Sequence, residues 1–158
     1  MKKYLFKIFI LYFFISCNSE NYFIEFKDLN DGWEYKSPVI FNFFAPQEPV
    51  DISLMIRVDK SYPFSNIFIK SKIMYEENVI IDTLELDLTK NEKGIFSGNS
   101  LSLQNHNFLI AKKVNLYKDV TFEVSHASRF LDSINAVKKL NGILSVGLLV
   151  EKYQNEKI

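Results

Sequence analysis

Residues 50–58 read Val-Asp-Ile-Ser-Leu-Met-Ile-Arg-Val, and this stretch decides the fold class. Apolar side chains stand at every second position, with Asp51, Ser53 and Arg57 between them. Successive side chains of a β-strand point to opposite faces of its sheet, so alternation with a period of two predicts a half-buried strand. The side chains that we expect to face the core are Val50, Ile52, Leu54, Ile56 and Val58.

The same alternation recurs on both sides of this strand, at residues 39–43, 67–75, 84–88 and 120–124. Residues 143–150 are apolar on both faces, which is typical of a central strand. Turn signals separate these stretches. They are Asp31-Gly32, a loop bracketed by Pro46 and Pro49, Glu76-Glu77-Asn78, Asn91-Glu92-Lys93-Gly94 and Asn141-Gly142. The pattern predicts an all-β fold, an antiparallel, jelly-roll-like β-sandwich of about seven to nine strands.

One segment, near residues 130–140, departs from this pattern. Leu131, Ile134 and Val137 or Lys138 recur at the three- to four-residue spacing of a helix, and Asn141-Gly142 is a suitable stop. We expect either one short helix or a long loop here.

The first 17 residues have the order of a lipoprotein signal. Lys2, Lys3 and Lys7 precede an apolar run, which ends in Phe14-Ile15-Ser16-Cys17. A small residue before the cysteine suits the signal peptidase, and the Cys17 thiol is the acceptor for diacylglycerol, with palmitate a typical acyl chain. We expect residues 1–16 to be a signal peptide, 17–21 a lipidated tether, and 22–158 a single β-sandwich domain.

Two alternatives to the lipoprotein signal stay open. One is an ordinary secretory signal with a chance cysteine. The other is a membrane-spanning helix. Residues 4–15 would form about 18 Å of helix at 1.5 Å per residue, whereas a bilayer core is about 30 Å thick.

Composition excludes several classes of function. The chain has 19 Lys and Arg residues and 19 Asp and Glu residues, and loss of the three lysines of the signal leaves 16 against 19. A net charge of −3 without a basic face does not predict nucleic-acid binding. Cys17 is the only cysteine, so the domain has no disulfide and no Cys-x-x-Cys metal motif.

Candidate catalytic residues are few. His106 and His126 are the only histidines, and His126 follows Val124 on an inward face, where we expect a hydrogen-bonded core histidine. Glu85 and Asp87 could be read as a glycosidase pair, but residues two apart on a strand share one face, so a solvated face is the simpler interpretation. The chain lacks nucleophile-elbow, P-loop and His-Glu-x-x-His motifs. We expect no enzyme, no metal, no cofactor and no small-molecule substrate.

Aromatic residues near the predicted loops are better candidates for binding. Trp33, Tyr35, Tyr62 and Phe64 could form a platform for sugar stacking, or they could be core edges and interface anchors. The Tyr62-Pro63-Phe64 segment lies between two predicted strands and is a candidate partner contact. The alternative is that Pro63 sets a turn while Tyr62 and Phe64 cap the end of the sandwich.

A series of short motifs, taken in order, resembles the GldH family of gliding-motility lipoproteins. The resemblance covers residues 22–152, nearly the whole predicted domain. Its motifs are Asp31-Gly32-Trp33, Pro38–Phe43, Arg57-Val58, Tyr62–Phe68, Asp82–Glu85, Ser125–Arg129, Leu140–Ile143, Val146–Leu148 and Val150–Lys152.

This resemblance implies a non-catalytic envelope lipoprotein that supports gliding motility and type IX secretion. Its expected partners are the membrane, through Cys17, and other envelope proteins of gliding or secretion. Residues 18–21 carry one acid, Glu20, rather than an acidic export cluster, so we expect the periplasmic face of the outer membrane. A glycan-binding surface lipoprotein is the alternative, and an envelope hydrolase is a third, weaker one.

The resemblance implies a protein of the Bacteroidota, a phylum in which O-glycosylation occurs at Asp-(Ser/Thr)-aliphatic sequences. Asp82-Thr83-Leu84 and Asp132-Ser133-Ile134 fit this pattern. We rank Ser133 above Thr83, because Ser133 lies in the predicted loop or short helix while Thr83 lies in a strand pattern.

Overall fold

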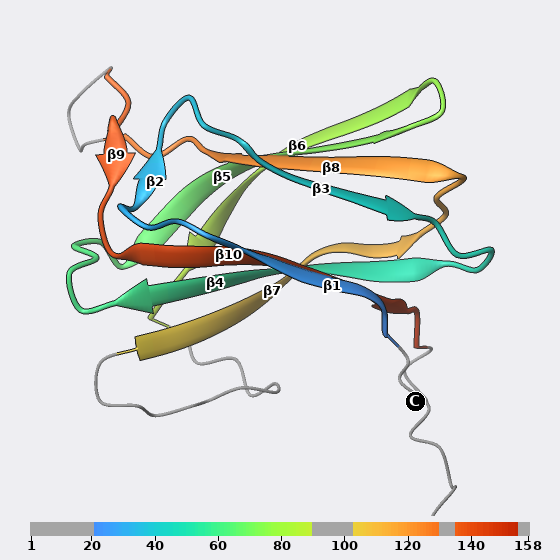
Figure 1. Ribbon diagram of the computed structural model, residues 1–158, viewed down its shortest axis with the longest axis horizontal. Coiled ribbons are helices and arrows are strands. Elements are labelled where there is room, and N and C mark those ends of the chain that lie inside the picture. Colours follow the sequence, from blue (N-terminus) through green and yellow to red (C-terminus); the bar gives the residue numbers. More distant parts are fainter. Residues whose placement is uncertain (1–20, 90–102, 130–134, 155–158) are drawn as a thin grey trace, which may run out of the picture.

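The computed structural model describes residues 21–89, 103–129 and 135–154, which form two four-stranded sheets packed face to face (Figure 1). All strand pairs within the two sheets are antiparallel, as predicted. The first sheet has the order β1 (Asn21–Asp28), β10 (Ile143–Lys152), β4 (Val50–Asp59), β7 (Leu103–Val114). The second has the order β3 (Val39–Phe44), β8 (Asp119–His126), β5 (Asn66–Tyr75), β6 (Asn78–Asp87).

The connectivity of the eight long strands is that of a jelly roll. Taken in chain order, the first, eighth, third and sixth form one sheet, and the second, seventh, fourth and fifth form the other. The described residues contain ten strands rather than seven to nine, because β2 (Trp33–Glu34) and β9 (Lys139–Leu140) form a separate two-stranded ribbon. Two-residue strands are too short to show an alternating pattern.

The strand directions define two ends of the sandwich (Figure 1). At the proximal end the chain enters β1 at Asn21, a residue that we assigned to the tether, and β10 ends there. This end also holds the β3–β4, β5–β6 and β7–β8 connections, at residues 45–49, 76–77 and 115–118. The distal end, on the left in Figure 1, holds the β2–β9 ribbon, the β4–β5 connection at residues 60–65, and residues 127–129.

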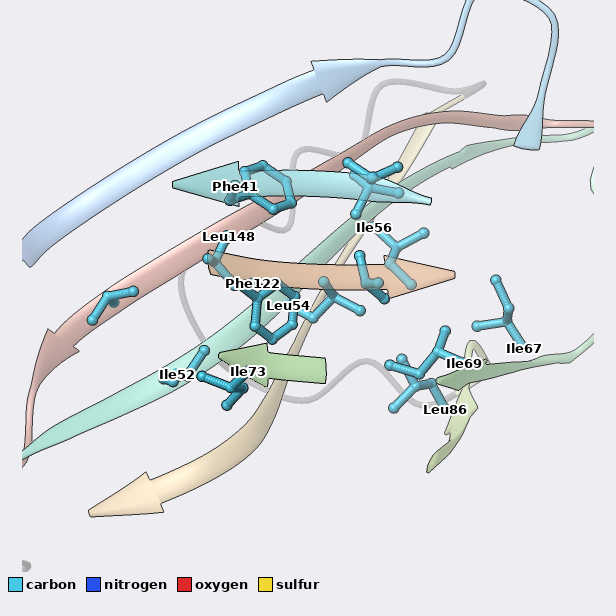
Figure 2. Close-up of a cluster of buried hydrophobic side chains, with 14 of the residues drawn as sticks. Phe41, Ile52, Leu54, Ile56, Ile67, Ile69, Ile73, Leu86, Phe122 and Leu148 are labelled. Atoms are coloured by element: carbon cyan, nitrogen blue, oxygen red, sulfur yellow. The ribbon is translucent and has the colours of Figure 1, made fainter. Parts of the chain in front are cut away.

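The predicted inward face of β4 is confirmed, since its five alternating side chains are each at most 3% exposed. They pack against apolar side chains of the opposite sheet, as Figure 2 shows for Phe41, Ile69 and Phe122. The other face of β4 is less open than a solvated face, because β4 lies between β10 and β7. Ser53 is 3% exposed, and buried Asp51 accepts a 2.7 Å hydrogen bond from the Lys113 backbone N–H.

Strand β10 occupies the predicted central position, between β1 and β4. Val146, Leu148 and Val150 are fully buried on its inner face, and Leu149 on the outer face is 7% exposed. Phe26 of β1 lies over Gly147, where an added Cβ would be 2.6 Å from the Phe26 ring.

The helix alternative is wrong for residues 135–140, which contain no helix. Their backbone groups bond to distant segments instead. The Val137 N–H donates to the Ser128 carbonyl at 2.9 Å, the Lys138 carbonyl accepts from the Tyr35 N–H at 2.9 Å, and β9 pairs with β2. These bonds replace helical ones. The predicted signal, Cys17, the turn at residues 91–94, and Ser133 lie outside the described residues.

Candidate functional site at the distal end

The distal end is closed by unusually close backbone contacts at two glycine turns. Gly32 has φ +92°, and a Cβ there would lie 2.5 Å from the Leu140 carbonyl oxygen. Gly142 has φ +82°, and a Cβ there would lie 2.3 Å from the Tyr62 backbone nitrogen. Glycine is required at both turns, because it adopts positive φ without a Cβ penalty and leaves room for the neighbouring chain.

Trp33 fills the interior beneath these turns. Its side chain is fully buried, and its indole N–H donates to the Ser37 carbonyl at 3.1 Å. The sugar-platform hypothesis is therefore wrong for Trp33, whose ring is not available for stacking on a ligand. Tyr35, in the turn that follows β2, is 40% exposed.

His126 is confirmed as a core histidine. It is 1% exposed, with its ring centroid 5.8 Å from Trp33 and 5.7 Å from Tyr35 in edge-on geometry. Within the described part of the chain neither ring nitrogen has a partner in regular hydrogen-bond geometry, but the Trp33 backbone lies close enough to act on the ring. Burial lowers the pKa of His126, and the Trp33 backbone and the charge of Glu34 partly oppose this shift. Burial therefore favours the neutral form of the ring.

The Tyr62-Pro63-Phe64 segment packs on the end of the core. The Tyr62 hydroxyl donates to the Asn66 carbonyl at 2.8 Å, burial raises the pKa of Tyr62, and the Phe64 ring stands edge-on at 5.7 Å. Both aromatics are half-buried against the hydrophobic core, while Pro63 is exposed. Asp59 fixes the start of the loop through the Ser61 N–H at 2.7 Å. This geometry supports the capping interpretation for the two rings and leaves Pro63 as the outward surface.

The remaining candidates lie elsewhere and do not converge. His106 on β7 is 6% exposed and stacks on Phe108 at 6.0 Å, and burial lowers its pKa. Glu85 on β6 is exposed and accepts from the Asn66 amide at 2.5 Å, while Asp87 accepts from the Thr89 N–H at 2.8 Å. Each carboxylate thus accepts a hydrogen bond from a different neighbour. No group of three His, Cys, Asp or Glu in the described ranges could hold a metal ion.

Thr83 is more accessible than its strand pattern suggested. It is exposed on β6, an edge strand of its sheet, and its backbone N–H donates to the Asp82 carboxylate at 2.7 Å. A side chain on an edge strand can be reached from the open side of the sheet, so position in a strand does not by itself disfavour modification.

Comparison with known proteins gives the family. The model of a family described as GldH lipoprotein matches residues 21–150. This chain belongs to the GldH lipoprotein family. It is 26% identical over 153 residues to a "Gliding motility lipoprotein GldH homolog" of Christiangramia forsetii, a match that covers 94% of each chain. No solved structure gives a significant match. No helix among the described residues is long and apolar enough to cross a membrane.

Several segments that carry the GldH resemblance meet at the distal end. Residues 31–33, 62–68 and 140–142 contact one another through the two glycine turns. Residues 125–129 join them, because Ala127 and Ser128 bond to the Phe68 backbone at 2.7 and 3.2 Å. Sequence reasoning identified these motifs separately and missed their convergence. The Asp31-Gly32 and Asn141-Gly142 turns were the sign of this convergence in the sequence, but each was interpreted only as a local turn between strands.

Proposed function

We propose that this GldH-family lipoprotein acts without catalysis, as a contact protein of the gliding machinery and the type IX secretion apparatus. Family membership over residues 21–150 is the observation that carries the proposal. The geometry of the domain supports it, since the candidate carboxylates are engaged with nearby groups and the histidines are buried singly in different places. Binding other envelope proteins is the role that such a closed sandwich can serve.

We propose Cys17 as the point of attachment to the membrane, with residues 1–16 removed. The basic head, the short apolar run and the Phe-Ile-Ser-Cys sequence support this assignment. Cys17→Ala should release the domain from the membrane fraction. A variant that remains in the pellet after a high-salt wash would contradict the assignment.

The proposed location is the periplasmic face of the outer membrane. Residues 18–21 contain one acid, which supports retention inside rather than display outside. Proteinase K added to intact cells should leave the domain whole and degrade it only after lysis. Digestion without lysis would place it at the surface and favour the glycan-binding alternative. Tyr35 is the most exposed of the four aromatic residues considered for sugar stacking.

The proposed partner contact is centred on exposed Pro63, with the outer edges of Tyr62 and Phe64. These side chains lie at the end of the sandwich opposite to the one where the chain enters at Asn21, so they face away from a membrane anchor. Aromatic residues and proline at such a rim can anchor a partner with little loss of entropy.

Pro63→Asp tests this contact without removing a packed ring. We expect the variant to fold normally, lose co-purifying envelope proteins after detergent extraction, and lose secretion or gliding. Pro63→Ala controls for loss of the proline ring. Asn42→Asp places the same charge on the exposed outer face of β3 and keeps the oxygen that accepts from Thr121 at 2.9 Å. Wild-type partners and phenotype in a folded Pro63→Asp protein would exclude this site.

We also propose O-glycosylation at Ser133, with Thr83 as a second site. Both fit the Asp-(Ser/Thr)-aliphatic pattern, and exposure on an edge strand supports Thr83. Intact-mass measurement of native protein should show mass beyond the lipidated polypeptide, lost in Ser133→Ala, Thr83→Ala or their combination. A mass equal to that of the lipidated polypeptide alone removes the hypothesis.

A further inference from the structure

The proximal end exposes aromatic side chains that its own core does not use. Phe44 is 73% exposed, more than any other large apolar side chain in the described ranges, and Tyr117 is 57% exposed. Phe44 ends β3 and Tyr117 lies in the β7–β8 connection, and these segments are adjacent because β3 pairs with β8. Two exposed aromatic side chains in adjacent segments at one end of a domain are the kind of surface that binds another surface.

These aromatics are held in defined turns. The Ala45 N–H, next to Phe44, donates to the Lys118 carbonyl at 2.8 Å, which joins the β3–β4 and β7–β8 connections. The Tyr117 ring lies 6.3 Å from Tyr75, and Lys118 pairs with Glu76 at 2.8 Å. The exposure of Phe44 and Tyr117 is therefore built into the closure of this end.

The chain enters the domain at this same end. Tyr22, the second residue of β1, is hydrogen-bonded to Glu48 of the β3–β4 connection, and Glu48 pairs with Lys152 at 2.6 Å. Cys17 precedes Asn21 by four residues, and four extended residues span at most about 14 Å. An acyl anchor on Cys17 therefore keeps the proximal end within about 14 Å of the attachment point, close to the lipid headgroups.

We propose that the proximal end rests on the bilayer, with Phe44 and Tyr117 in the headgroup region. This inference rests on the lipid anchor proposed above. Tyrosine is enriched at membrane–water interfaces, where its polar tip stays hydrated while the ring is buried, and an exposed phenylalanine gains from leaving water.

The charge at this end is compatible with that contact. Glu48 and Glu76 are each paired with a lysine, and Lys113 lies over the Tyr153 ring at 5.2 Å. Lysines near an interface can extend their ammonium groups toward water or phosphate. Acids and lysines are both present, so the contact depends on the aromatics rather than on anionic lipid.

A label on the proximal surface can test the contact in the lipidated protein. Cys17 is the only native cysteine and is consumed by acylation, so an introduced cysteine is the single free thiol. Gln47→Cys, exposed beside Phe44, and Lys138→Cys, exposed at the distal end, would each carry an environment-sensitive fluorophore in phosphatidylethanolamine–phosphatidylcholine vesicles. We expect the label at 47 to be protected from aqueous iodide and quenched by brominated lipid, and the label at 138 to show the reverse.

The same label in a Phe44→Ser, Tyr117→Ser background should lose its protection while the protein stays attached to the vesicles. An attached protein whose label at 47 is as open to iodide as the label at 138 overturns the membrane contact and leaves the anchor standing. If that open label becomes protected only in native membranes, the surface binds a protein instead. A protein that is not acylated and does not bind vesicles removes the anchor and the contact together.

Discussion

The two ends of the sandwich close their turns by opposite means. At the distal end, Gly32 and Gly142 take positive φ at points where a Cβ would meet another segment's backbone. At the proximal end, Glu76, Lys113 and Lys118 take φ of 50°, 56° and 56° with full side chains. The left-handed conformation is shared, but Gly32 and Gly142 are half-buried against neighbouring chain, whereas the three proximal residues are exposed. The distal end is thus closed by backbone packing at glycines, whereas the proximal end is closed by residues whose side chains stay exposed.

The largest expected effect comes from filling the space at a distal glycine. Gly142→Ala should destabilise the protein by at least about 3 kcal/mol, because a Cβ 2.3 Å from the Tyr62 nitrogen forces two backbone segments apart in a left-handed turn. Gly147→Ala is the matched control. Its Cβ would meet the Phe26 ring at 2.6 Å, but that ring is 42% exposed and can move, so we expect about 1–2 kcal/mol. Equal losses of unfolding free energy for the two variants, measured by denaturant unfolding, would contradict the proposed difference between the two glycines.

Removing the distal aromatic pair should have the next largest effect. Tyr62→Ala with Phe64→Ala should cost roughly 2–3 kcal/mol, because both rings are half-buried and Tyr62 also loses its hydrogen bond to Asn66. Thermal unfolding would show a melting temperature lower by several degrees. An unchanged melting temperature would mean that the rings do not cap the core, and would strengthen their assignment to a partner.

The two buried histidines predict that the free energy of unfolding depends on pH. Burial lowers the pKa of both His126 and His106, so the unfolded chain binds more protons below its histidine pKa of about 6.5. Stability should be fully present above that pH and fall as the pH drops below it, by at most about 1.4 kcal/mol per pH unit for each histidine. His126→Phe should flatten the profile between pH 7.5 and 5.5. A wild-type profile in this variant would show that His126 does not titrate on unfolding.

The sequence predicted the faces of the long strands because alternation is local. Ile52 and Leu54 face inward whatever the partner strand is, and the apolar run at residues 143–150 is typical of a central strand, the position that β10 takes. The jelly-roll class followed from the number and spacing of such strands. The helix alternative failed at residues 135–140 because helical spacing says nothing about Ser128 and Tyr35, which take up that segment's backbone groups.

The distal site was predicted less well, since its properties depend on contacts between distant residues. The capping role of Tyr62 depends on the approach of Gly142, and the burial of Trp33 depends on pairing with Leu140. Thr83 was ranked low as a strand residue, yet its strand is at an edge. A local sequence pattern does not show which strand is at the edge of a sheet or which turns, distant in sequence, pack on one another.

The smallest expected effect on stability comes from the proximal aromatics. Phe44→Ser with Tyr117→Ser should change the free energy of unfolding of the unanchored Cys17→Ala protein by less than about 1 kcal/mol, because both rings are largely exposed and little apolar area is lost from the core. The comparison is with Tyr62→Ala, Phe64→Ala at the other end, measured in the same denaturant series. The loss of unfolding free energy should then be clearly larger for the distal aromatic pair, which packs on the core, than for the proximal pair, which is free to contact a membrane. A large loss from the proximal pair would mean that Phe44 and Tyr117 support the β3–β4 and β7–β8 connections, and their exposure would no longer indicate a binding surface.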